Sequence, residues 1–253
     1  MLLRRITQHV KEQNWFAVGI DFVIVVFGVF IGIQVANWND DRAEHQMETK
    51  ALVALKKELE SSIVFADART RAYEQATEAG KRSLTYINAP YDCGQNCWSI
   101  VVDFMHASQW QDLSVSFSAY ENMRDRGFPR NPDIIDAVEA YRLQNINNAD
   151  TFEVLPVYRS LVRQLIDVPA QEFYWANCWS LVDGIEEYVL NCPEGVSPEA
   201  ARELVNEITA NPDIEPHLTE WIGAIVSLPQ TLGDQNAAAQ RAVDVIDREL
   251  ERR

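Results

Sequence analysis

The chain has 253 residues and a formal net charge of −16, and 47% of its residues are hydrophobic. So many apolar side chains exclude a disordered chain, and the length fits one or two domains. No basic run offsets the 38 acidic side chains. We expect no nucleic-acid partner, because binding one requires a cationic surface that displaces phosphate counterions.

Residues 15–38 form an apolar run with one ionisable side chain, Asp21. At about 1.5 Å per residue, a helix of this length spans a bilayer with some tilt. The run is too long for a signal-peptide core, and no cleavage motif follows it. More bases than acids precede it and more acids than bases follow it. By the positive-inside rule, we expect residues 1–14 to be a cytoplasmic tail and the rest of the chain to be periplasmic, anchored in a bacterial inner membrane.

One face of this expected membrane helix combines an acid with small residues. At about 100° per residue, Asp21, Gly28 and Gly32 fall within about 40° of one another, with Ala36 beside them. The spacing Gly28-x-x-x-Gly32-x-x-x-Ala36 lets two helix backbones approach closely. A carboxyl group in the apolar layer needs a partner, a proton or water. We expect this face to pair with a second copy or with another membrane protein. A plain anchor with an interfacial acid is the alternative.

Residues 39–88 predict a long helix, because they contain no proline and many strong helix formers. A 3–4 spacing places one apolar stripe along it. The stripe consists of Leu52, Leu55, Leu59, Ile63 and Ala66. We expect the stripe to pack on the chain's own domain. A parallel coiled coil between protomers is the alternative, disfavoured because the pattern ends after Ala66 without sustained heptads.

Three segments recur in the same order at an offset of about 80 residues. The pairs are 96–103 with 177–184 (both beginning NCWS), 114–119 with 195–200 (a loose match), and 131–134 with 211–214 (both NPDI). The offset predicts two tandem helical repeats, 89–168 and 169–253. If a ligand pocket exists, their junction is the expected place, since such interfaces favour ligand sites.

Prolines and capping residues predict where the helices of these repeats begin. Pro90 and Pro169 suit first-turn positions, and Asn131, Ser197 and Asn211 each precede a proline as N-caps. Equivalent inner faces are expected from the i, i+4, i+7 spacing. They consist of Ile134, Val138 and Tyr141 in the first repeat and Ile214, Leu218 and Trp221 in the second, followed by Ala238, Val243, Ile246 and Leu250 in a closing helix 234–252. The expected fold class is all-α.

Four cysteines follow the membrane segment: Cys93, Cys97, Cys178 and Cys192. An even number in an oxidising compartment favours disulfides over a metal site or a redox motif. Local pairs, 93–97 and 178–192, are the simplest arrangement. The second pair requires a break in the chain between its ends, because one unbroken helix would separate them by about 21 Å. Gly184 is the expected break. A bridge between repeats, such as Cys97–Cys178, is the alternative.

No catalytic motif emerges from the sequence. Acidic pairs such as Glu186 and Glu187, or Asp133 and Asp136, are typical of a solvated helix face, and His106 is typical of an ordinary core or surface histidine. Trp175 and Trp179 share a face of one expected helix, where core packing is favoured over a ligand cage. We therefore expect no catalytic residue, metal or cofactor.

Two segments resemble a family of bacterial single-pass membrane proteins with a GVxIGIQVxNWN-type membrane segment and a domain of unknown function. IDFVIVVFGVFIGIQVANWND, residues 20–40, is similar to the family's membrane signature, and residues 116–141 are loosely similar to a second family segment. The matching positions are Gln34, Asn37, Trp38, Asn39, Tyr120, Glu121, Gly127 and Tyr141. The resemblance implies a single-pass topology with a helical exterior and no assigned chemistry. The four cysteines are not part of the family pattern.

These observations predict a non-enzymatic interaction protein that assembles through its membrane helix. The expected partners are the lipid bilayer and either a second copy or another membrane protein. The alternative is a periplasmic sensor of an unidentified small molecule that acts through a partner, since the expected tail is too short for an output domain. A hydrolase without a known motif is a third hypothesis.

Overall fold

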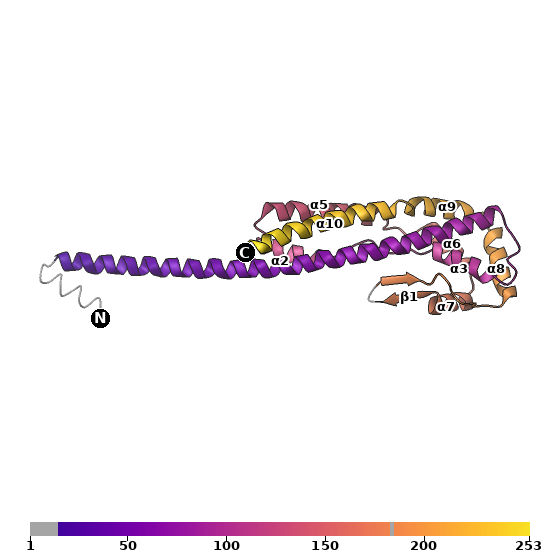
Figure 1. The fold of residues 1–253 in the computed structure, drawn as a ribbon, viewed down its shortest axis with the longest axis horizontal. Helices are drawn as coiled ribbons and strands as arrows, with labels where there is room; N and C mark the ends of the chain where they lie inside the picture. Colours follow the sequence, from indigo (N-terminus) through magenta and orange to yellow (C-terminus); the bar gives the residue numbers. More distant parts are fainter. Residues whose placement is uncertain (1–14, 183–184) are drawn as a thin grey trace. The chain divides into compact units, whose positions relative to one another are not determined.

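A computed structural model describes residues 15–182 and 185–253. The chain divides into two compact units, Met1–Val53 and Ala54–Arg253. In the first unit every described residue belongs to helix α2 (Trp15–Asn88), which has 74 residues and continues into the second unit (Figure 1). The predicted apolar helix and the predicted long helix after it are therefore a single element. The expected tail, residues 1–14, lies outside the described residues.

Among the residues that the structure describes, α2 is the one helix whose length and composition allow it to cross a membrane. Its most apolar 18-residue window has a mean hydropathy of 2.4, and none of that window is buried. Large side chains such as Phe22, Phe27 and Ile31 are more than half exposed. A surface this apolar must be covered by lipid or by another apolar element.

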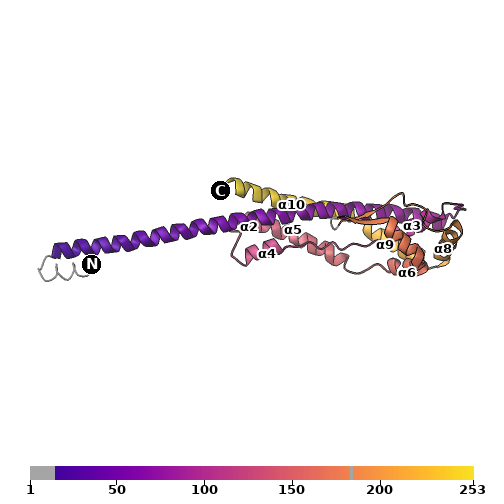
Figure 2. The same cartoon turned by 90° about the horizontal axis from the view of Figure 1, so that it is seen from below.

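The second unit is built mostly of helices, in agreement with the predicted fold class. After α2 its described elements are α3 (Cys97–Ala107), α4 (Ser118–Arg124), α5 (Pro132–Thr151), α6 (Val157–Leu165), α7 (Val168–Asn177), β1 (Trp179–Val182), β2 (Ile185–Tyr188), α8 (Pro198–Ala210), α9 (Ile214–Ile225) and α10 (Leu228–Glu251). The longest helices run alongside one another (Figures 1 and 2). α5 packs along α10, α3 against α8, and α6 against α9.

Polar contacts join α10 to the part of α2 within this unit. Lys56 Nζ lies 2.6 Å from Asp247 Oδ1, and Asn236 Nδ2 donates to Asp67 Oδ1 at 2.6 Å. Both views show the two helices side by side (Figures 1 and 2). α10 begins at Leu228, earlier than the predicted start at 234. Its predicted inner positions are buried except for Leu250, which is half-buried.

The apolar core of the second unit confirms the predicted inner faces. Leu55, Leu59 and Ala66 of α2 are buried, so this stripe packs on its own domain instead of forming a coiled coil. All six predicted inner positions of α5 and α9 are also buried. Aromatic rings fill much of the core: Tyr73 and Trp221 meet edge to face with their centroids 6.3 Å apart. Such ring pairs add to the stability that burial alone provides.

Several helix ends follow the predicted capping, and one does not. The side chains of Asn131 and Ser197 accept hydrogen bonds from backbone N–H groups in the first turns of α5 and α8. Asn211 makes the same kind of bond, although α9 begins only at residue 214. Pro169 lies in the first turn of α7. The prediction for Pro90 was wrong: α2 ends at residue 88, and Pro90 lies in the connection to α3.

The tandem repeat remains a prediction that the structure does not confirm. The best-matching segments adopt different structures, since 97–103 is helical in α3 whereas 179–182 is strand β1. The two predicted units also do not fold separately, because helices from one pack on helices from the other throughout a single compact unit. The two segments do meet, and residues from both of them, such as Asp103 and Cys192, line one cavity in the described part of the chain.

A small two-stranded hairpin, β1 and β2, accompanies the helices of this unit. The strands are antiparallel, with Trp179 opposite Tyr188 and Leu181 opposite Glu186. α7 ends at Asn177, so Trp179 belongs to a strand and not to the helix that carries Trp175. The predicted break at Gly184 lies outside the described residues.

Gly80 marks a close approach between α2 and α9. A Cβ atom at this position would overlap the side chain of Ile222 and lie 2.5 Å from its Cγ1 atom. We expect Gly80→Ala to lower the free energy of unfolding by about 1 kcal/mol, because an overpacking cost of about 1–3 kcal/mol exceeds the gain in helix propensity. Chemical denaturation of the full-length protein in detergent micelles measures this difference.

Gly223 provides the matched control for this substitution. It lies on the exposed side of α9, and a Cβ there would meet no described atom within 4 Å. Gly223→Ala should therefore stabilise the protein by about 1 kcal/mol. Equal stabilisation by both substitutions would contradict the close packing at Gly80.

Candidate functional site

The glycine face of α2 is open in the single chain. A Cβ atom added at Gly28 or Gly32 would meet nothing within 4 Å among the described residues, and Ala36 is exposed. Asp21 is half-buried, and its Oδ2 atom has no hydrogen-bond partner in the part of the chain that the structure describes. The helical path of this segment places the four residues on one side of α2, as predicted.

The cysteines form the two local disulfides, Cys93–Cys97 and Cys178–Cys192, each with its Cα atoms 5.0 Å apart. This pairing confirms the simplest prediction and excludes the bridge between repeats. The hairpin returns the chain and so allows the second pair. Within residues 15–182 and 185–253, no group of three histidine, cysteine or acidic side chains is placed to hold a metal ion.

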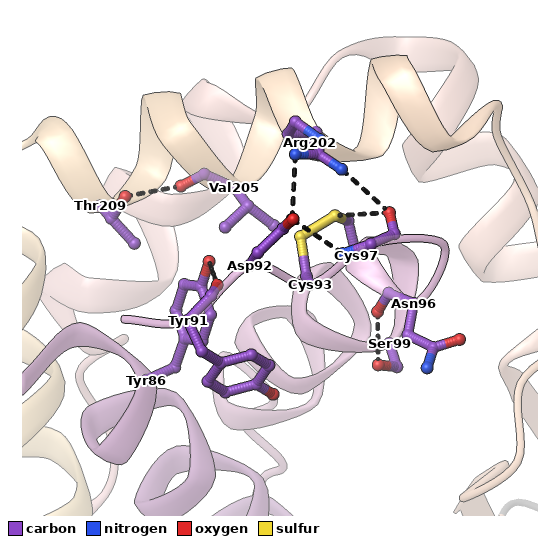
Figure 3. The surroundings of a disulfide bond; sticks show 11 residues. Tyr86, Tyr91, Asp92, Cys93, Asn96, Cys97, Ser99, Arg202, Val205 and Thr209 are labelled. Atoms are coloured by element: carbon purple, nitrogen blue, oxygen red, sulfur yellow. Dashed lines mark hydrogen bonds and ion pairs between the residues drawn. A yellow bond between two sulfur atoms is a disulfide. The ribbon is translucent and has the colours of Figure 1, made fainter. Parts of the chain in front are cut away.

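The first disulfide lies in a short loop held by α8 (Figure 3). Arg202 donates to Asp92 Oδ1 at 3.0 Å and to the carbonyl oxygen of Gly94 at 3.2 Å. Burial plays little part here, since Asp92 and Arg202 are both exposed. The Gly94 N–H, and next the charge of Arg202, lower the pKa of Asp92. These contacts hold the loop against α8.

The residues that carry the family resemblance lie in different places. Gln34, Asn37, Trp38 and Asn39 are exposed on α2, outside the second unit. Tyr120 is buried and donates to Glu139 Oε1 at 2.9 Å. Burial, and next this contact, raise the pKa of Tyr120 to about 12.

The other residues of the family resemblance in the second unit are a surface acid, a glycine after a helix and a core tyrosine. Glu121 lies 3.7 Å from Arg142 on the surface. Gly127 has a φ of +79°, the left-handed conformation that glycine adopts readily after a helix. Tyr141 is buried. Within this set, Tyr120 and Glu121 are linked through Glu139 and Arg142, which lie 3.8 Å apart.

A different set of charged side chains does come together within the second unit. We call Arg69 from α2 and Arg159 and Arg163 from α6 the arginine cluster. All three contact the segment 108–112, which follows α3. Arg159 Nη1 and Arg163 Nε donate to Ser108 at 3.0 and 3.1 Å, to its carbonyl and hydroxyl oxygens respectively.

The other contacts of the cluster reach further along this segment. Arg163 Nη2 donates to Gln109 Oε1 at 3.3 Å, and Arg69 Nε donates to the carbonyl oxygen of Asp112 at 3.0 Å. Gln109 in turn donates to the hydroxyl of Tyr174 at 2.9 Å. The segment thus links the arginines to the buried tyrosines of the core.

A chain of hydrogen bonds joins the cluster to the hairpin. Arg69 Nη1 donates to Gln111 Oε1, and Gln111 Nε2 donates to the hydroxyl of Tyr188 at 2.6 Å. That hydroxyl and Trp179 Nε1 both donate to Glu186 Oε2, at 3.4 and 3.3 Å. Glu186 was predicted to lie on a solvated helix face. Instead it is half-buried on a strand, facing this network.

Aromatic rings surround these polar groups. His106 stacks on Tyr188 and meets Tyr174 edge to face, with ring centroids 5.5 and 5.4 Å apart. Burial lowers the pKa of His106, so the neutral ring donates its Nε2–H to the carbonyl oxygen of Cys178 at 3.3 Å. His106 is thus a core histidine, as predicted.

Burial also lowers the pKa of each arginine in the cluster. Loss of solvation, and next the positive charge of Arg159, lower the pKa of Arg163 to about 10. Burial lowers the pKa of Arg69 and of Arg159 as well. All three side chains remain charged at neutral pH. Arg163 further stacks over Trp175, with its guanidinium carbon 5.1 Å from the ring centroid.

A cavity lies elsewhere in the unit, between α2, α3 and residues 190–192. It has a volume of about 710 Å³. Its charged side chains satisfy each other, because Arg82 makes two hydrogen bonds to Asp103 at 2.6 and 2.9 Å. The arginine cluster is therefore the stronger candidate for recognising a charged ligand.

Comparisons of the chain with protein-family models, with curated proteins and with solved structures find no match. The resemblance of the membrane segment to a family therefore stays a prediction.

Sequence reasoning missed the arginine cluster entirely. In a sequence, an arginine on a mostly polar helix is expected to be solvated. Arg69 also lies on α2, far in the sequence from the other two arginines on α6. One local signal was available. Arg159 and Arg163 stand at i and i+4 on α6, a like-charge spacing that destabilises a helix unless something compensates.

Proposed function

We propose that this protein is a membrane-anchored interaction protein that assembles through the Asp21–Gly28–Gly32–Ala36 face of α2 and presents its disulfide-bonded helical unit to the periplasm. The observation that carries the proposal is this open glycine face on a helix whose most apolar 18-residue window has no buried residue. In lipid, helices associate through close backbone packing and polar contacts, because burial in hydrocarbon gives no hydrophobic gain. A carboxyl group in the same stripe adds a reason for pairing.

The two disulfides support the proposed location of the second unit, since such bonds persist in oxidising compartments. Its acidic surface supports a soluble domain held away from anionic lipid. After residue 38 the sequence has 36 acidic and 19 basic residues. The proposed partner is a second copy of the chain or the helix of another membrane protein.

Replacing both Gly28 and Gly32 with isoleucine should abolish association of the membrane helices, because the branched side chains keep the backbones apart. A bacterial membrane two-hybrid assay of the full-length chain measures self-association, and crosslinking in native membranes followed by pull-down detects another partner. The matched control places isoleucine at Val23 and Val26, on the opposite face, and should leave association unchanged. Association that survives the glycine substitutions would refute the proposed interface.

A ligand sensor that signals through a partner is the second candidate function. The arginine cluster favours it, because the cluster gathers positive charge inside a strongly acidic protein. The two functions are compatible, since they use different parts of the chain.

A further inference from the structure

We infer that the arginine cluster is a binding site for a small tetrahedral oxyanion of the phosphate type, held by Arg69, Arg159 and Arg163 beside the β1–β2 hairpin. This site goes beyond the proposed assembly through α2 and does not depend on it.

The first argument is charge balance. Charged groups removed from water are normally paired. Among residues 15–182 and 185–253, no carboxylate oxygen lies within 4.0 Å of a guanidinium nitrogen of the cluster. Glu186 is the acid whose charge acts on all three arginines. The charge of Asp112 acts in addition on Arg69. Three positive charges thus face two acids among the described residues, and the arginines contact neither carboxylate directly, which leaves a net positive site.

The second argument is the supply of hydrogen-bond donors. Each guanidinium carries five N–H donors, and the cluster makes five hydrogen bonds to described residues in total. Every acceptor in these bonds is a neutral oxygen. Most of these donors therefore make no hydrogen bond to a described residue. Planar guanidinium groups match the oxygens of phosphate in paired hydrogen bonds.

The third argument concerns the surroundings of the cluster. Arg69 is buried, with 8% of its surface exposed, whereas Arg159 and Arg163 are half-buried and reachable from solvent. The stacking of Arg163 on Trp175 fixes the guanidinium group of Arg163 in place. The hydrogen bonds to Gln111 and Asp112 fix the guanidinium group of Arg69. Side chains held in position lose little entropy when a ligand binds.

The net negative charge of the protein favours a small anion over a polyanion as the ligand. A net charge of −16 repels a polyanion such as a nucleic acid, whose many charges would face the acidic surface. A small anion meets only the local field of the cluster. Inorganic phosphate is therefore the probe of choice, with sulfate as a second tetrahedral oxyanion.

Isothermal titration calorimetry of the full-length protein in neutral detergent micelles tests the site. In a buffer of low ionic strength without other oxyanions, we expect saturable phosphate binding with half-saturation below about 1 mM. Arg159→Gln and Arg163→Gln should each weaken binding by about tenfold, since each removes a charge-assisted contact. Arg163→Lys should weaken binding less than Arg163→Gln, because lysine keeps the positive charge and loses only the paired donors of the planar guanidinium.

Arg71→Gln is the matched control, because Arg71 is exposed on the same helix as Arg69 and removing it changes the net charge equally. It should bind phosphate as the unmodified protein does. If Arg163→Gln fails to fold by circular dichroism, Arg159→Gln decides, since Arg159 makes a single hydrogen bond to the described residues, to the carbonyl oxygen of Ser108.

Two results would overturn the inference: no binding of phosphate or sulfate at about 10 mM, or equal binding by the Arg159, Arg163 and Arg71 variants. The Gly28 and Gly32 double variant should bind phosphate normally. Failure of the anion site and failure of assembly through α2 are therefore separate outcomes.

Discussion

Replacing Cys178 and Cys192 with alanine should lower the free energy of unfolding by about 3 kcal/mol. The reason is chain entropy: the bridge closes a loop of about 15 residues, and cross-linking a loop of this size removes about that much freedom from the unfolded chain. Cys178 is also fully buried in the core. In a thermal unfolding experiment, the loss corresponds to a decrease in Tm of about 6–12 °C.

The other disulfide is the natural comparison. The bridge between Cys93 and Cys97 closes a much shorter loop, so the same entropy argument predicts a cost of about 2 kcal/mol for its removal. Both variants are measured by chemical denaturation under oxidising conditions. A larger loss from the shorter loop would show that contacts around it, such as those of Arg202, outweigh chain entropy.

Trp221→Ala is the second substitution with a large expected effect, about 3–5 kcal/mol. Trp221 is 5% exposed and packs its ring against Tyr73 and Phe152. Its Nε1–H donates at 2.8 Å to the carbonyl oxygen of Ala107, the last residue of α3. Removal of the indole leaves a cavity and an unpaired buried carbonyl at once.

Trp221→Phe separates these two contributions. It keeps an aromatic ring and loses the hydrogen bond, so we expect about half of the destabilisation of Trp221→Ala. Leu190→Ala, at a side chain that is 66% exposed, should change the free energy of unfolding by less than about 0.5 kcal/mol. A Trp221→Ala variant as stable as the Leu190 control would contradict the packing described around α9.

Local patterns predicted the helices of this protein well, because the determinants of a helix lie within a few residues. The stripe Leu55, Leu59 and Ala66 is buried as its spacing predicts. Asn131 and Ser197 cap α5 and α8 because their side chains reach N–H groups only two or three residues away. The apolar segment of α2 needs only its own composition to be recognised.

The hairpin escaped prediction because distant contacts decide its structure. The letters NCWS occur twice, yet the chain is helical after the first asparagine and extended after the second. In the second copy, Tyr188 packs on His106 and bonds with Gln111, both far away in the sequence. Such tertiary partners override local preference, and a single sequence does not reveal them.

The arginine cluster was hidden for the same reason. Its members come from helices about 90 residues apart, and they meet only because both helices contact the segment 108–112. The residues highlighted by the family resemblance were visible in the sequence, and two of them, Tyr120 and Glu121, share contacts with Glu139 and Arg142. Sequence patterns thus found the long apolar helix and the disulfides, whereas the arginine cluster could be recognised only in the folded structure.

The position of the Cys178–Cys192 bridge has a practical consequence for how the protein is made. The bridge closes the segment that contains the whole hairpin, including Glu186 and Tyr188, which face the arginine cluster. A chain expressed in a reducing cytosol would lack this closure and would release the hairpin more easily. Material for anion titrations should therefore come from an export pathway or from oxidative refolding, with the absence of free thiols verified beforehand.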